Sequence, residues 1–256
     1  MNWYKTATKT AVSVTPAEFG AMTREEKVAL ARKTSLALAT QRLFFTEEYR
    51  RKEWILEYLA QNPSIHPEAQ PLFFTEQYEG KSKQYEGKSS ILRRLAQNTS
   101  ITPATQFLFF TEKYEYKGWV LYWLAKNSSI TPATQLLFFT ETYKSPFDTS
   151  QLGSLARSPS IAPETQRLLL TEEYENKGAV LEYLALNESI APETQLLFFT
   201  EEYPDKNDVL KKLKGWNPSF LRDFTTAQWL QIKNAARGVM RLQVLKKRLE
   251  KIAGVP

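Results

Sequence analysis

The chain of 256 residues is 42% hydrophobic and 13% aromatic, which is enough to bury a core in one or two domains. It has no cysteine, so disulfides, thiolate metal sites and a cysteine nucleophile are excluded. The net charge of +6 is uneven: residues 1–203 carry 22 Lys and Arg against 24 Asp and Glu, whereas residues 204–256 carry 12 against 4.

Residues 1–34 are predicted to form an N-terminal cap. Thr23 and Glu26 have the spacing of a capping box, which starts a helix, and Leu30-Ala31 aligns with a helix end in each later repeat. This segment lacks the apolar run of a signal peptide, and no stretch reaches the roughly 18 apolar residues of a membrane span. We therefore expect a cytoplasmic protein with no membrane partner.

Residues 35–216 contain six copies of a repeat of about 29 residues. One glutamine marks each copy: Gln41, Gln70, Gln106, Gln135, Gln166 and Gln195. The second interval is longer by a seven-residue tandem duplication within residues 77–90, and the fourth has two extra residues near 144–148. Both additions fall at the same point of the repeat, which predicts an external loop.

Each repeat is predicted to form two helices, because no segment alternates with a period of two. Helix A opens with a proline, at Pro67, Pro103, Pro132, Pro163 and Pro192. Its constant leucines and its neighbouring aromatic residues point around most of the helix, which predicts burial on several sides. Helix B has one apolar stripe and ends at Asn or Ser, residues that accept a left-handed C-terminal turn.

The residues that all copies share indicate architecture. Besides the glutamine, each copy has a Thr-Glu pair, at positions 46–47, 75–76, 111–112, 140–141, 171–172 and 200–201. A row of carboxylates is also a candidate for cation binding, but shared positions of repeat proteins usually form the interfaces between repeats. We therefore expect the Gln, Thr and Glu side chains to hydrogen-bond between layers.

The junction between repeats resembles a known family. The run Leu-Ala-x-Asn-x-Ser-Ile-x-Pro-Glu/Ala-Thr-Gln, at Leu124–Gln135 and Leu184–Gln195, is similar to the Asn-Pro-x-Thr-Pro junction of the variant leucine-rich repeat family. The segment Leu59–Gln70, with Asn62-Pro63-Ser64, resembles it most. The resemblance covers about residues 30–220 and implies a right-handed superhelix of paired helices, related to HEAT-type solenoids. The repeat here is longer, and the cysteine-ligated iron–sulphur module of that family has no ligands in this chain, so the resemblance implies a fold and no activity.

The outward positions of helix B differ between repeats, and in the first three copies they are rich in aromatic and basic residues. Exposed Trp and Tyr interleaved with Arg and Lys are favoured as binding anchors, and they also stack on bases of single strands. Packing of these aromatic residues on neighbouring helices is the alternative. The predicted partner-binding residues are Trp54, Tyr58, Arg93, Arg94, Trp119, Tyr122, Trp123, Lys126 and Arg157.

Residues 217–256 are predicted to hold a long capping helix, from about 226 to 252, with apolar side chains on one side. The opposite side is basic, and both a polar outer surface and a phosphate-binding surface fit it. The basic residues are Lys233, Arg237, Arg241, Lys247, Arg248 and Lys251.

The chain lacks common catalytic constellations. Its one histidine, His66, precedes Pro67 where sister repeats have Thr or Ala, which predicts a surface helix cap, and no glycine-rich phosphate loop occurs. The sequence therefore predicts an all-α solenoid that is a noncatalytic scaffold for a protein or peptide, without cofactor or metal. A nucleic-acid-binding solenoid is the second hypothesis, and an enzyme resembling a helical-repeat DNA glycosylase is the third.

Overall fold

The computed structural model describes residues 11–46, 52–75, 87–140 and 148–212, which form 14 helices and no strand beyond one isolated bridge between Val12 and Leu36. The described part of the chain is therefore all-α, as the sequence predicts. The chain divides into two compact units, Met1–Ile130 and Thr131–Pro256. Residues 77–86 of the tandem duplication and the whole predicted capping segment, residues 217–256, lie outside the described residues.

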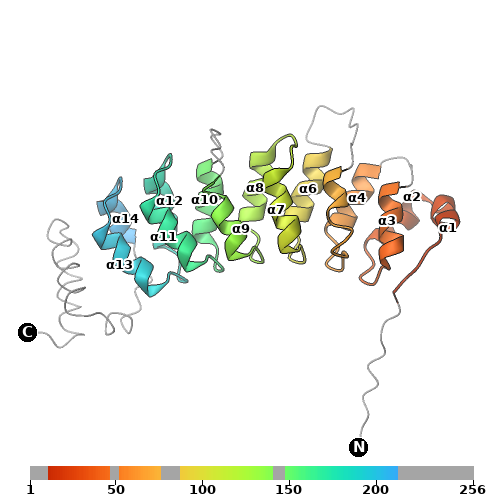
Figure 1. The fold of residues 1–256 in the computed structure, drawn as a ribbon, viewed down its shortest axis with the longest axis horizontal. Helices are drawn as coiled ribbons and strands as arrows, with labels where there is room; N and C mark the ends of the chain where they lie inside the picture. Colours follow the sequence, from red (N-terminus) through yellow and green to blue (C-terminus); the bar gives the residue numbers. More distant parts are fainter. Residues whose placement is uncertain (1–10, 47–51, 76–86, 141–147, 213–256) are drawn as a thin grey trace, which may run out of the picture. The chain divides into compact units, whose positions relative to one another are not determined.

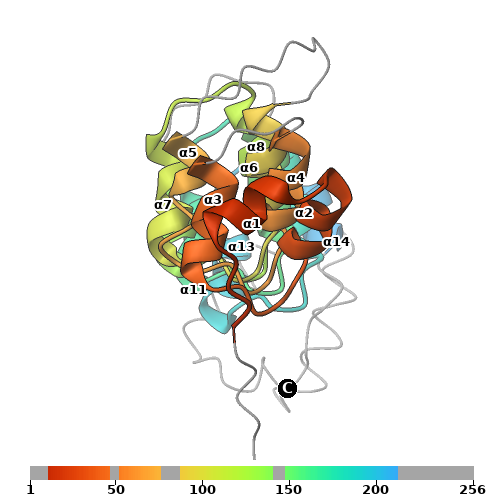
Figure 2. The same cartoon turned by 90° about the vertical axis from the view of Figure 1, so that its right-hand side faces the viewer.

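The N-terminal unit consists of two rows of helices (Figures 1 and 2). One row holds the B helices, in which α2, α4, α6 and α8 each contact the next; α3, α5 and α7, the A helices, each pack on the B helix that follows them. The bounds are α1 Pro16–Ala21, α2 Arg24–Ala31, α3 Leu38–Thr46, α4 Lys52–Ala60, α5 Leu72–Thr75, α6 Lys88–Ala96, α7 Pro103–Thr111 and α8 Lys117–Ala125.

The C-terminal unit repeats this arrangement. Its B helices α10, α12 and α14 contact one another in order, and so do its A helices α9, α11 and α13. The bounds are α9 Pro132–Leu137, α10 Asp148–Arg157, α11 Pro163–Thr171, α12 Lys177–Ala185, α13 Pro192–Thr200 and α14 Lys206–Lys212.

The helix that follows Thr23 begins as the sequence predicts. Thr23 Oγ1 accepts a hydrogen bond from Glu26 N at 3.3 Å, and Glu26 Oε2 accepts one from Thr23 N at 2.7 Å, so the capping box is confirmed. Thr15 and Glu18 form the same arrangement at the start of α1. His66 also acts as a helix cap would, because its Nδ1 accepts from Glu68 N at 3.3 Å.

One predicted helix start is wrong. Pro67 opens a series of turns, and α5 begins only at Leu72. The cause is Pro71, which sits where every other copy has a residue with an N–H. A proline here cannot donate to the carbonyl four residues earlier and crowds that carbonyl. The backbone N–H groups instead donate to the carbonyl three residues earlier, as in a 3₁₀-helix. Gln70 N donates to Pro67 O at 3.3 Å, and Phe73 N donates to Gln70 O at 3.3 Å.

The A helices bury one stripe, which corrects the expectation of burial on several sides. In α7 the buried residues are Thr105, Gln106, Phe109 and Phe110, spaced i, i+1, i+4 and i+5. The constant leucine is buried in the first copy, as Leu43, but half-buried in the later ones, as Leu108 is, so most of the constant leucines lie at the edge of the core. The paired aromatic rings already fill the space between the rows of helices, and they pack edge to face, as Phe74 does on Phe109 with ring centroids 5.0 Å apart.

The B helices bury one apolar stripe, as predicted. In α12 this stripe is Val180, Leu181, Leu184 and Ala185, while the residues between them stay partly or fully exposed.

The glutamine shared by all copies joins one repeat to the next in the first five copies, as expected. Gln166 Nε2 donates to Ile161 O and to Ser189 O, both at 3.1 Å, and its Oε1 accepts from Ala191 N at 2.8 Å. Gln41 makes the same three bonds with Leu36 O, Ser64 O and His66 N. A buried amide thereby satisfies backbone groups at the junction that helices leave open.

The asparagine after helix B is a second junction residue, and its predicted role was wrong. Asn187 Nδ2 donates to Ala156 O at 2.8 Å and to Ser158 O at 2.9 Å of the preceding repeat, and its Oδ1 accepts from Ser189 N at 2.8 Å. Asn62, Asn98 and Asn127 do the same. The non-glycine residues with positive φ in the described ranges are Tyr116, Asn176 and Asp205, which precede B helices, so the asparagine does not make a left-handed turn.

The Thr hydroxyls shared by the copies form hydrogen bonds within their own helices, and of the shared Glu residues Glu112 acts on the preceding helix B only through its charge, which raises the pKa of Lys88 against the larger lowering by burial. Thr171 Oγ1 donates to Arg167 O, and Thr200 Oγ1 to Leu196 O, each within its own helix. Glu112, Glu172 and Glu201 are C-cap residues whose backbone N–H groups close the last turn. A hydroxyl or a carboxylate at a helix end finds a local partner first, so these residues terminate helix A.

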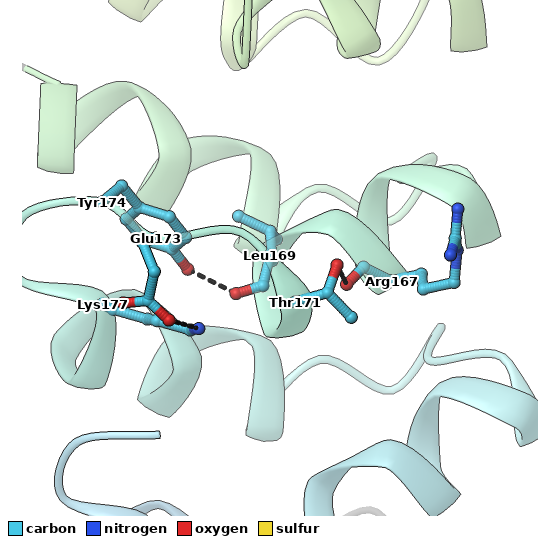
Figure 3. A network of polar contacts seen from close by, with 6 residues as sticks. All are labelled: Arg167, Leu169, Thr171, Glu173, Tyr174 and Lys177. Atoms are coloured by element: carbon cyan, nitrogen blue, oxygen red, sulfur yellow. Dashed lines mark hydrogen bonds and ion pairs between the residues drawn. The ribbon is translucent and has the colours of Figure 1, made fainter. Parts of the chain in front are cut away.

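The turn from helix A to helix B is closed by a tyrosine and a lysine (Figure 3). Tyr174 Oη donates to Leu169 O at 2.7 Å, and the buried Lys177 pairs with the exposed Glu173 at 3.1 Å. Burial, reinforced by the charge of Glu173, raises the pKa of Tyr174 well above its usual range. In other copies the lysine caps helix A directly, as Lys52 Nζ does by donating to Phe45 O.

Two phenylalanines of α7 test the assignment of the core. Phe109 is fully buried and Phe107 is 49% exposed, although both are on the same helix. We expect Phe109→Ala to lower the free energy of unfolding by about 3–5 kcal/mol, and Phe107→Ala by less than about 0.5 kcal/mol. Urea denaturation followed by circular dichroism measures both, and equal losses would contradict the buried stripe.

The junction glutamine gives a second test. Replacing Gln166 by alanine leaves Ala191 N–H and two carbonyls without their partner, so the free energy of unfolding should fall by about 2–4 kcal/mol. Arg167→Ala, on the exposed neighbouring residue, is the control and should change it by less than about 0.5 kcal/mol. A Gln166 variant as stable as this control would show that the inter-repeat bonds contribute nothing.

Candidate partner-binding face

The structure divides the predicted site residues between the two units. Eight lie on consecutive B helices of the N-terminal unit or directly after them: Trp54 and Tyr58 on α4, Arg93 and Arg94 on α6, Trp119, Tyr122 and Trp123 on α8, and Lys126 as the C-cap of α8. Arg157 lies on α10 of the C-terminal unit. The predicted basic residues of the C-terminal segment, Lys233, Arg237, Arg241, Lys247, Arg248 and Lys251, lie outside the described residues.

The two aromatic side chains of α4 each form a cation–π contact with an arginine that the sequence did not predict. The guanidinium carbon of Arg24 lies 4.3 Å from the ring centroid of Trp54, and that of Arg32 lies 4.0 Å from Tyr58. The two rings touch edge to face at 5.0 Å. Arg32 occupies the position after α2 that aligns with Gln61 and Lys126, so applying the repeat register to residues 1–34 would have found it.

A second cluster joins α6 and α8. The guanidinium of Arg93 lies 4.9 Å from the ring centroid of Trp119. Lys126 Nζ lies 4.8 Å from Tyr122 and 5.0 Å from Trp123, and it donates to Tyr122 Oη at 3.0 Å. We call the residues of both clusters the ring–cation face: Arg24, Arg32, Trp54, Tyr58, Arg93, Trp119, Tyr122, Trp123 and Lys126.

The aromatic side chains of this face are packed within the repeats and are also partly exposed, so they have features of both interpretations, packing and partner binding. Trp54 is 38% exposed, while Tyr58, Trp119, Tyr122 and Trp123 are half-buried. Each ring contacts a cation of its own chain, so the aromatic residues do pack within the repeats. They nevertheless keep part of their surface accessible, and this part lies along one row of helices.

Arg94 differs from the other cations, because it forms an ion pair inside the unit. Its Nε lies 3.4 Å from Glu57 Oε2, and Ser90 Oγ donates to Glu57 Oε1 at 2.8 Å. The amide of Gln61, oriented with its oxygen toward Arg94, accepts from Arg94 Nη1 at 2.9 Å. Arg94 is therefore a structural link between α4 and α6.

Arg93, on the adjacent position, has no such partner in the described ranges. Its Nε is buried without a hydrogen-bond acceptor, and the same holds for Arg24 Nε and Trp123 Nε1. Burial, followed by the neighbouring charge of Arg94, lowers the pKa of Arg93, and Glu57 offsets this only in part. The ring–cation face thus holds N–H donors that have no acceptor among the described residues.

The C-terminal unit pairs its B helices by the same rules. The guanidinium of Arg157 lies 3.3 Å from the ring centroid of Tyr183, as Arg32 lies on Tyr58, and Lys212 pairs with Glu182, as Arg94 pairs with Glu57. These residues occupy equivalent positions of successive repeats. The outward positions of the B helices therefore interact from one repeat to the next.

Neither a metal site nor a membrane span is found in the part of the chain that the structure describes. Those residues contain no group of three or more His, Asp or Glu side chains placed to hold a metal ion. No helix among them has both the length and the apolar character that crossing a bilayer requires. In comparisons with known proteins, the chain matches no family model, no curated protein and no solved structure.

Adjacent arginines of α6 test whether this face serves stability. Arg94→Met leaves Glu57 without its cation, so we expect a loss of about 0.5–1.5 kcal/mol in the free energy of unfolding, small because both side chains are partly exposed. Arg93→Met removes a cation–π contact but also the repulsion from Arg94, so it should change stability by less than about 0.5 kcal/mol. Thermal and urea denaturation compare the two, and a more damaging Arg93 variant would make Arg93 a structural residue.

Proposed function

We propose that the chain is a noncatalytic helical-repeat scaffold that binds a protein or peptide through the ring–cation face. The observation that supports this proposal is the row of partly exposed aromatic rings and cations along α4, α6 and α8. This row also contains N–H donors that have no acceptor among the described residues. Aromatic residues and arginine are the side chains that contribute most to protein interfaces.

The architecture that supports this function is a solenoid of six repeats, with residues 1–34 and 217–256 as caps, in the style of variant leucine-rich and HEAT-type repeats. The Gln and Asn junction bonds recur in both units with the period of the sequence repeat. A stack of this kind offers a long surface built from variable positions on a constant frame.

The state of the rings favours a protein partner over a single-stranded nucleic acid. Base stacking needs open ring faces. On this face each aromatic ring already carries a cation of the chain, at 4.0–5.0 Å from its centroid. The rings therefore act mainly as supports for cations, and the cations and ring edges remain for a partner.

Nucleic-acid binding is the second candidate, and one observation favours it. Residues 204–256 carry 12 Lys and Arg against 4 Asp and Glu, and such an excess attracts phosphates. The residues proposed for this role are Lys233, Arg237, Arg241, Lys247, Arg248 and Lys251.

Peptide display separates the two candidates. Selection of a random dodecapeptide library on the full chain should enrich peptides, and Trp119→Ala with Trp123→Ala should weaken them about tenfold or more, because these rings support the cations. Phe107→Ala, an exposed aromatic residue outside the face, is the control and should leave affinity within about twofold. Circular dichroism checks that each variant is folded.

The nucleic-acid candidate has its own measurement. If the chain binds mixed-sequence DNA or RNA, log affinity should fall with log salt at a slope of about −0.7 to −0.9 per phosphate, and Arg237→Glu, Arg241→Glu and Arg248→Glu together should abolish binding. Binding of this kind without any enriched peptide would replace the first proposal by the second. Absence of both would refute both.

A further inference from the structure

We infer that the α6–α8 part of the ring–cation face binds an acidic segment of the partner protein, with Arg93, Lys126 and Trp123 as the contact residues. This inference rests on the proposed function and adds the chemistry of the partner. It starts from a contrast within the unit: Arg42 and Arg94 are paired with Glu68 and Glu57, whereas Arg93 and Lys126 form no ion pair within the described ranges.

Contact with a ring leaves the terminal Nη groups of Arg93 for a ligand, because Arg93 is half-buried and only its Nε is enclosed without an acceptor. A guanidinium that lies over a ring uses its flat face, and its N–H groups remain in the plane, where a carboxylate binds them in pairs. The guanidinium carbon of Arg93 lies 4.9 Å from the ring centroid of Trp119, and this contact restricts the guanidinium before any partner arrives. A fixed cation binds an anion at a smaller entropic cost than a mobile one.

Two buried donors point to an acceptor that the described residues do not supply. Arg93 Nε on α6 and Trp123 Nε1 on α8 are both buried without a partner. A buried N–H without an acceptor is unfavourable, so a rotation of either side chain that opens its N–H to an acceptor of the partner stabilises the complex. The carboxylate oxygens and main-chain carbonyls of an acidic segment are acceptors of the required type.

An acidic segment also complements the positive charge of Arg93 and Lys126. Arg93 lies beside Arg94, and the lowered pKa of Arg93 reflects burial and this repulsion. Lys126 is exposed and lies on the rings of Tyr122 and Trp123. A segment with two or more Asp or Glu residues neutralises both cations, while its apolar side chains contact the accessible parts of the rings.

The test compares two double variants that remove the same charge. Peptides selected on the full chain from the random dodecapeptide library should be enriched in Asp and Glu. Arg93→Gln with Lys126→Gln should weaken them about tenfold or more, and Gln in place of the peptide's Glu should do the same. Lys113→Gln with Arg167→Gln, two exposed cations that belong to neither cluster of the face, should leave affinity within about twofold.

The outcomes are distinguishable by fluorescence anisotropy with the selected peptides, after thermal melts have shown that both variants are folded. Enriched peptides without an excess of acidic residues, or equal losses in the two double variants, would overturn the acidic segment and leave the scaffold function standing. Displacement of the peptide by a twelve-residue thymidine oligonucleotide in the unaltered chain but not in the Arg93 and Lys126 variant would assign the face to nucleic acid instead. Failure to enrich any peptide would overturn the proposed function itself.

Discussion

The structure depends on buried amide side chains that satisfy the backbone where short helices meet. A helix of nine residues leaves much of its own backbone unpaired at its ends, and here those ends are packed against the next repeat. Gln166 and Asn187 each serve three backbone groups, two of them in a neighbouring repeat. Because the same amides recur in successive copies, they set one register for the helices of each unit.

A fixed register explains how variable residues of successive B helices find one another. Glu57 meets Arg94 and Glu182 meets Lys212 at equivalent positions, although the two pairs belong to different units. A change at one outward position therefore alters its partner one repeat away. Sequence variation along this face is best read in pairs of residues, each pair from consecutive repeats.

The ring–cation face departs from this pattern of pairing. Arg94 is matched by a carboxylate, but Arg93, one residue away, lies on a ring with a buried donor unpaired. Sites where a local rule of pairing is broken are commonly sites of function, because a partner supplies what the fold omits. The face also differs from the exposed side of α7, where Phe107 is an aromatic residue that lies outside both clusters of rings and cations.

The sequence by itself determined the two-helix repeat, its period, the buried stripe of the B helices and the bridging role of the glutamine, because periodic apolar residues and shared positions report directly on local structure. It failed where the outcome depended on which individual groups meet once the repeats are packed. Asn62 and its equivalents look like helix ends, and only the packed structure shows that their amides reach carbonyls of the preceding repeat. Likewise, the Trp and Tyr residues of the face could be predicted from their spacing along helix B. Their pairing with Arg24 and Arg32, and the placement of Arg93 on a ring with its Nε unpaired, are properties of side chains that only the tertiary structure brings together.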